Sequence, residues 1–288
     1  MIKKKPEPPK KEKISVDSET LELPLPEEVI AEAEEIARRG QASIEEEVKN
    51  RRDFRDVLTV TIDPVRAKDF DDALSIRVTK PGIFEVGVHI ADVSFYVRPG
   101  TKLDAEARLR ATSIYLTNRV IPMLPPALSD DLCSLKEGVD RLAFSAIFTL
   151  DNEANILDQW FGRTVINSNK RFTYEEVERI TKADEVRNAT SSEPARPAGG
   201  PEVVFRTELL KLKDLADKLD KKKINAGALA FEEDEYAYEV DAEGRPISIM
   251  KAERLESHKL VEDFMLLANK QVAEYVSKLI KNRDHSFV

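Results

Sequence analysis

The chain has 288 residues, and 41% of them are hydrophobic, which is enough for a sizeable core. The formal net charge of −9 argues against a protein that coats nucleic acid through a basic surface, although a locally basic channel is compatible with it. One cysteine, Cys133, permits no internal disulfide. No run of 18 apolar residues and no signal-like start is present. We therefore expect a soluble, cytoplasmic protein with no membrane association and no stable protein partner.

The N-terminal region divides into two parts. Residues 1–22 are rich in Lys, Glu and Pro and have little to bury, so we predict a disordered charged arm. Residues 23–52 are predicted to be a helical lead-in. Its first helix covers Glu27 to Arg39, where apolar residues recur on one face, and Gly40 can end it. A second, short helix is expected over 44–52.

Residues 53–288 are predicted to form one domain of the α+β class, with a mixed, mainly antiparallel β-sheet and flanking helices. A Ser/Pro/Ala/Gly-rich insert at 188–201 is expected to be a flexible surface loop. The lysines of the helix that follows the insert are expected to be solvated. Apolar patterns and turn residues predict strands within 54–97, 141–150, 156–166, 236–240 and 247–252, and helices over 203–223 and from Ser257 onward.

One acidic stretch stands out, T-I-D-P-V-R-A-K-D-F-D-D-A from Thr61 to Ala73, between two β-prone runs. Its like charges repel unless a cation lies among them, and hard divalent cations prefer oxygen ligands. The spacing excludes an EF-hand, whose loop would need a glutamate at Lys80. A solvated acidic loop is the alternative, but the apolar flanks favour a magnesium site. The candidate metal ligands and catalytic residues are Asp63, Asp69, Asp71 and Asp72.

Magnesium held by carboxylates suits one chemistry above others. Mg²⁺ keeps several waters, takes a few carboxylates and completes its coordination shell with substrate phosphate. Two such ions about 4 Å apart activate the attacking water and stabilise the leaving oxygen of a phosphodiester. The sequence therefore contains ligands suited to phosphodiester hydrolysis, and it leaves the number of ions open.

Several motifs in order resemble the catalytic (RNB) domain of the ribonuclease II / ribonuclease R family, and bacterial ribonuclease R in particular. The resemblance runs from about Arg51 to the C-terminus. It implies a magnesium-dependent, 3′-to-5′ hydrolytic exoribonuclease that degrades single-stranded RNA to nucleoside 5′-monophosphates. Besides the acidic stretch, the matching motifs are V-G-V-H-I-A-D-V-S at Val86, T-S-I-Y-L at Thr112, L-S-D-D-L-C-S-L at Leu128 and H-K-L-V-E-D-F-M-L-L-A-N at His258.

The resemblance also implies residues that hold RNA. The family's tyrosine at the position of Tyr115 stacks near the RNA 3′ end, and an aromatic at the position of Phe231 forms the other side of that clamp. A glutamate at the position of Glu262 lies near the terminal nucleotide. From the residues alone, an aromatic such as Tyr115 is more often part of a core, and Glu262 reads equally well as an exposed helix glutamate.

The family continues beyond the point where this chain ends. Its further part carries arginines that hold RNA phosphates and another acid near the scissile bond, and this sequence contains no match to them. We therefore expect a catalytic domain that is incomplete at its C-terminus. Two alternatives remain open: a catalytically silent fragment that binds RNA or a protein, and a structural acidic cluster that binds Ca²⁺.

Overall fold

The fold is organised around one seven-stranded sheet with the order β1-β8-β7-β4-β3-β2-β9. The computed structural model describes residues 24–116, 119–190, 201–228, 236–241, 246–251 and 254–280. Neighbouring strands are antiparallel except at the two edges, where β1 is parallel to β8 and β9 is parallel to β2. The strands are β1 (Arg52–Asp53), β2 (Thr59–Asp63), β3 (Asp72–Lys80), β4 (Ile83–Ala91), β7 (Asp140–Asp151), β8 (Ile156–Asn167) and β9 (Lys170–Thr173). The predicted α+β class with a mixed, mainly antiparallel sheet is confirmed.

Turn residues set the strand boundaries. Pro81 and Gly82 connect β3 to β4, and Gly82 has a φ of 76°, which glycine adopts without strain. Two further pairs of strands lie outside the main sheet. These are β5 (Ile114–Tyr115) with β6 (Val120–Ile121), and the predicted hairpin of β10 (Tyr236–Val240) with β11 (Pro246–Lys251).

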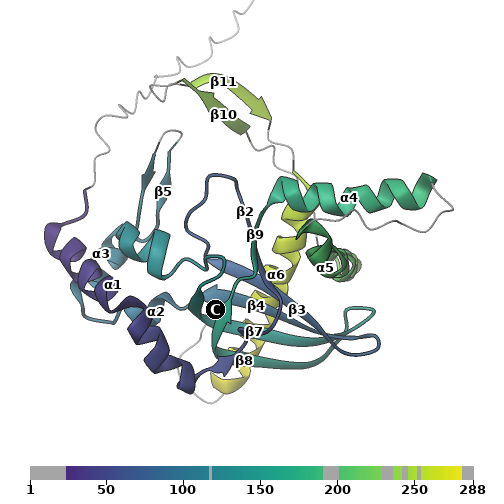
Figure 1. Cartoon of the computed structure of the whole chain (residues 1–288), viewed down its shortest axis with the longest axis horizontal. Helices are drawn as coiled ribbons and strands as arrows, with labels where there is room; N and C mark the ends of the chain where they lie inside the picture. Colours follow the sequence, from purple (N-terminus) through teal and green to yellow (C-terminus); the bar gives the residue numbers. More distant parts are fainter. Residues whose placement is uncertain are drawn as a thin grey trace, which may run out of the picture.

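Helices cover both faces of the sheet, because each face presents apolar side chains (Figure 1). One face packs against α4 (Tyr174–Thr190), α5 (Pro201–Asn225) and α6 (Glu256–Ile280). The other packs against α1 (Glu27–Glu47), the short α2 (Val93–Tyr96) and α3 (Lys102–Arg110). In the described residues, no helix combines the length and the apolar content that crossing a bilayer requires.

The N-terminal helical region shares a core with the sheet. The backbone of α1 leaves the helical conformation at Gly40 (φ 17°, ψ −108°), where the sequence predicts a helix end, and a 3₁₀ turn over Val48–Asn50 follows. Val29, Ala33 and Ile44 are buried in the same hydrophobic cluster as side chains of β7 and β8. This segment therefore packs on the domain that follows it.

The structure describes only the two ends of the predicted insert at 188–201. Helix α4 continues to Thr190 and α5 begins at Pro201, so both ends of the predicted insert are helical. The remaining residues, 191–200, lie outside the described part of the chain.

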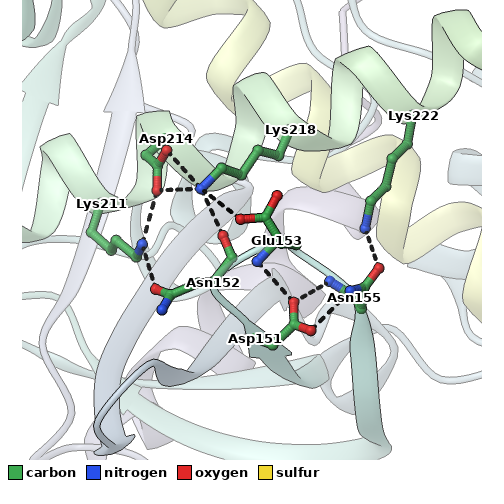
Figure 2. Close-up of polar contacts among 8 residues, drawn as sticks. All are labelled: Asp151, Asn152, Glu153, Asn155, Lys211, Asp214, Lys218 and Lys222. Atoms are coloured by element: carbon green, nitrogen blue, oxygen red, sulfur yellow. Dashed lines mark hydrogen bonds and ion pairs between the residues drawn. The ribbon is translucent and has the colours of Figure 1, made fainter.

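Lysines on α5 fix this helix to the turn between β7 and β8, which corrects the expectation that they are solvated (Figure 2). Lys218 Nζ donates to the backbone oxygen of Asn152 at 2.7 Å, and Lys211 Nζ contacts the Asn152 side chain at 3.3 Å. Lys222 Nζ donates to Asn155 Oδ1 at 2.7 Å. Asp151 orders the turn internally, because its carboxylate accepts backbone N–H groups of the same turn.

Replacing Lys218 with methionine is expected to lower the free energy of unfolding by at most about 1 kcal/mol, because its contacts are solvent-exposed. The change keeps a long apolar stem and removes a charged donor, whose side chain is 26% exposed, from the exposed backbone oxygen of Asn152. Urea denaturation measures the effect, and Lys221→Met on the exposed side of the same helix is the matched control. Equal stability of the two variants would contradict this function of Lys218.

Candidate active site

The four aspartates lie where β2 runs into β3. Asp63 is the last residue of β2 and Asp72 is the first of β3, while Asp69 and Asp71 belong to the connection. Asp63 pairs in register with Thr173 of the parallel strand β9. Two of the four carboxylates therefore project from strands inside the sheet, and the other two from the loop between them.

The segment that follows a π-helical turn at Leu128–Leu132 holds this loop in place. Ser134 Oγ donates to the backbone oxygen of Lys68 at 2.7 Å and accepts from the backbone N–H of Phe70 at 3.0 Å. The backbone N–H of Leu135 donates to the Phe70 oxygen at 2.9 Å. The L-S-D-D-L-C-S-L motif thus supplies the contacts that shape the acidic loop.

Arg171 on β9 contacts the acidic loop. Its Nη2 donates to the backbone oxygens of Pro64 and Val65 at 2.7 and 2.9 Å, and its guanidinium lies 5.5 Å from the centre of the Phe70 ring. Its positive charge also acts to lower the pKa of Asp63. Arg171 is not among the candidate site residues predicted from the sequence. The parallel pairing of β9 with β2, which brings it to the loop, leaves no local signal in the sequence.

Burial and mutual repulsion disfavour ionisation of these carboxyl groups. Loss of solvent, followed by the charge of Asp72, raises the pKa of Asp63 to about 7. Loss of solvent and the charge of Asp71 raise the pKa of Asp72 to about 6. The pKa of Asp71 is raised by reduced solvation and by repulsion from Asp69. The aspartates are therefore close enough to form one electrostatic unit.

Oxygen ligands of this kind fit a hard divalent cation. Asp63 is 9% exposed, and its Oδ2 is buried without a hydrogen-bond partner. Burying an ionised oxygen without a partner is costly, and a bound cation removes that cost. In the part of the chain that the structure describes, no three His, Cys, Asp or Glu side chains are arranged to hold a metal as they stand. Cation binding therefore requires the side chains to turn toward a common centre, which their repulsion opposes in the free protein.

Tyr115 lies beside the carboxylates, at the mouth of a cavity. Its hydroxyl donates to Asp69 Oδ2 at 2.6 Å, and this hydrogen bond is the main cause that raises the pKa of Tyr115 to about 12. Tyr115 is 65% exposed, so the interpretation of this residue as part of the core is wrong. The cavity holds about 330 Å³ and is lined by Asp69, Asp71 and Tyr115 together with apolar side chains that include Ile90 and Met123.

The other two predicted RNA contacts have different outcomes. Glu262 lies on α6, where its carboxylate pairs with the guanidinium of Arg254. Phe231 lies outside the described residues. Near the start of α6, the ring of His258 stacks on Tyr174 with 4.0 Å between ring centres, and the charges of Asp63 and Asp72 both act on the Tyr174 hydroxyl. The beginning of α6 is therefore close to the aspartates.

The protein has an α+β fold in which four aspartates lie in and beside the connection from β2 to β3, and two of them, Asp69 and Asp71, line a cavity together with Tyr115. The RNB domain matches residues 51–283, so the chain belongs to the RNB domain family, as the motifs predict.

The chain is similar to members of this family that include exonucleases and a protein named an inactive exonuclease. Over 240 residues it is 43% identical to DIS3-like exonuclease 2 of Schizosaccharomyces pombe, covering 82% of this chain and 26% of that protein. It is 42% identical over 236 residues to inactive exonuclease DIS3L2 of Arabidopsis thaliana, covering 81% of this chain and 22% of that protein. The structure of Mycoplasma genitalium RNase R in complex with ribose methylated single-stranded RNA has a TM-score of 0.70 at 25% identity, covering 88% of this chain and 40% of that one. The chain spans about a quarter of the length of these two curated relatives.

Proposed function

We propose that this chain is the metal-binding part of a 3′-to-5′ hydrolytic exoribonuclease that degrades single-stranded RNA to nucleoside 5′-monophosphates in the cytoplasm. The observation that carries the proposal is the placement of Asp63, Asp69, Asp71 and Asp72 in and beside the β2–β3 connection, where Asp69 and Asp71 line a cavity with the exposed Tyr115. Membership of the RNB family supports it, as does a structural neighbour that holds single-stranded RNA.

Magnesium is the proposed cofactor, with the four aspartates holding it directly or through water. If these carboxylates held Mg²⁺, the ion would supply activation of the attacking water and stabilisation of the departing 3′ oxygen of the phosphodiester. The chain itself contributes position and charge. Ser134 and Arg171 fix the backbone of the acidic loop, and because the pKa values of Asp63 and Asp72 are raised, a bound cation would favour the ionised form of both.

Tyr115 is the proposed platform for a terminal base. Stacking on an aromatic ring holds single strands without regard to sequence, because every base has a π face. The hydrogen bond from Tyr115 to Asp69 would also couple the position of that ring to one of the proposed metal ligands. Phe231 and Glu262 are proposed as further RNA contacts on the strength of the family motif alone.

A catalytically silent RNA-binding or protein-binding fragment is the second candidate. A relative of 42% identity is named an inactive exonuclease, and this chain spans only part of the length of its relatives. The family match alone therefore does not decide between cleavage and binding.

Uniformly labelled single-stranded RNA, incubated with the purified chain, separates the candidates. Release of nucleoside 5′-monophosphates with Mg²⁺, and none with EDTA, is the result expected of the enzyme. Retention of RNA on the protein without products would favour the silent fragment. A Ca²⁺-dependent rise in melting temperature without RNA binding would favour a structural acidic cluster instead.

A further inference from the structure

A row of paired side chains leads across the sheet away from the aspartates. Asp72 of β3 is paired in register with Ile90 of β4, Ile90 with Phe144 of β7, and Phe144 with Arg163 of β8. Directly paired residues on neighbouring strands point to the same face of a sheet. With strands about 4.8 Å apart, the row is roughly 14 Å long. It joins a proposed metal ligand at one end to an arginine at the other.

The side chains of this row are exposed to solvent, whereas those of the adjacent row are covered. Ile90 is 43% exposed, Phe144 is 48% exposed and the Arg163 side chain is 51% exposed. The adjacent row on the same face consists of Leu74, Val88, Ala146 and Phe161. Its first three residues are buried, and all four pack within or against the cluster under α4, α5 and α6. The helices therefore cover the adjacent row and leave the row from Asp72 through Ile90 and Phe144 to Arg163 exposed. We call this row the strip.

Arg163 supplies a positive charge at the far end of the strip. Its Nε lies 4.0 Å from Asp92 Oδ2. Arg51 holds the same carboxylate at 2.8 Å, with both of these side chains almost fully buried. Because Arg51 already neutralises Asp92, the half-exposed guanidinium of Arg163 is able to contact an anion from solvent.

We infer that this strip carries the part of a single-stranded RNA that precedes its 3′-terminal nucleotide, with a base stacked on Phe144 and a phosphate bound by Arg163. The inference rests on the proposed function, since the 3′ end is assigned to the aspartates. Three features favour RNA as the occupant. The strip begins at Asp72 and, through Ile90, adjoins the cavity lined by Tyr115. It presents the aromatic ring of Phe144 on a sheet face, and it ends in the cation of Arg163.

The decisive experiment measures equilibrium binding of a fluorescent single-stranded oligoribonucleotide by anisotropy. The Asp71→Asn chain is used as the background, so that the RNA is not degraded. Phe144→Ala is expected to raise the Kd by roughly 5- to 150-fold, the range for loss of one stacked base. Phe144→Tyr is expected to keep the parent Kd. Leu157→Ala, at an exposed position elsewhere on β8, is the matched control and is expected to leave the Kd unchanged.

A second variant tests the phosphate contact. Arg163→Gln is expected to weaken binding and to lower the slope of log Kd against log salt by about one, the effect of losing one phosphate contact. Arg108→Gln on α3, where the arginine is 74% exposed, is the control with an unchanged slope. Binding of a nucleoside monophosphate, which has no nucleotide before the terminal one to place on Phe144, is expected to be the same in all variants.

Two results would overturn the inference. One is a Phe144→Ala chain that binds the oligoribonucleotide as tightly as Leu157→Ala does. The other is a Phe144→Ala chain that changes oligomeric state in gel filtration with an unchanged Kd, which would assign the strip to a second copy of the protein. Neither depends on cleavage. A chain that binds RNA through Phe144 but releases no mononucleotides refutes the proposed activity and supports RNA binding by the strip. A chain that releases mononucleotides but binds RNA equally well as Phe144→Ala refutes RNA binding by the strip and supports the proposed activity.

Discussion

Asp71→Asn is expected to lower the release of nucleoside 5′-monophosphates from single-stranded RNA by about 10³-fold. Asparagine keeps the shape of the side chain and removes the negative charge. Loss of a metal ligand at a phosphoryl centre costs several kcal/mol of transition-state stabilisation, and each 1.36 kcal/mol is a factor of ten in rate. The rate is measured at saturating RNA and Mg²⁺, so that weaker binding does not mask the effect on the chemical step.

A matched control separates this effect from a general change in charge. Asp158 is exposed on β8, so Asp158→Asn removes the same charge away from the site and is expected to keep the parent rate. Equal rates in the parent chain, Asp71→Asn and Asp158→Asn would remove Asp71 from the catalytic machinery. Loss of folding in Asp71→Asn is checked by its melting temperature.

The metal-free protein is expected to lose stability as the pH rises from about 4 to about 7. The pKa of Asp63 is raised from 3.8 to about 7 in the folded chain, so the folded state binds the proton more tightly than the unfolded state does. Between these two values the folded state therefore holds more protons, and the free energy of unfolding falls with increasing pH. The contribution of Asp63 is complete below about pH 4, is lost by about pH 7, and amounts to at most about 4 kcal/mol.

Comparison of the parent chain with Asp63→Asn isolates this contribution from those of other carboxyl groups. Urea denaturation in EDTA is expected to give similar stabilities at about pH 4, where both side chains are neutral, and a more stable variant at about pH 8. Mg²⁺ is expected to restore the stability of the parent at about pH 8 and to leave Asp63→Asn less affected. A parent chain whose stability relative to Asp63→Asn does not change with pH would contradict the burial of an ionisable Asp63.

Local patterns in the sequence predict many of the strands and turns of the sheet. Pro81 and Gly82 mark a turn wherever the rest of the chain lies, and the polar residues 151–155 separate two long apolar runs that pair as β7 and β8. Gly40 interrupts the first helix for the same local reason. The aspartates are near one another because they fall within ten residues of one connection. Each of these features depends on neighbours in the sequence, and the structure confirms them.

The contacts that complete the site connect residues far apart in the chain, and local patterns contain no information about them. Tyr115 reaches Asp69 from 46 positions away, and Arg171 reaches Pro64 from 107 positions away. The row from Asp72 to Arg163 exists only because four strands pair in one register, whereas the alternation along a single strand predicts a face and not a partner. The sequence places the lysines of α5 in solvent, and this is wrong because the turn that they contact lies far away in the chain.

The central claim is that the four aspartates bind a divalent cation together, and calorimetric titration of Mg²⁺ into the purified chain at about pH 7 tests it most directly. We predict saturable binding that releases protons, because Asp63 and Asp72, with pKa values of about 7 and about 6, must ionise to bind a metal. Proton release is read from the difference in heat between two buffers of unlike ionisation enthalpy. We also predict that Asp71→Asn abolishes the saturable heat and that Asp158→Asn retains it. Absence of saturable binding in the parent chain, or binding that Asp71→Asn leaves undiminished, would contradict the claim.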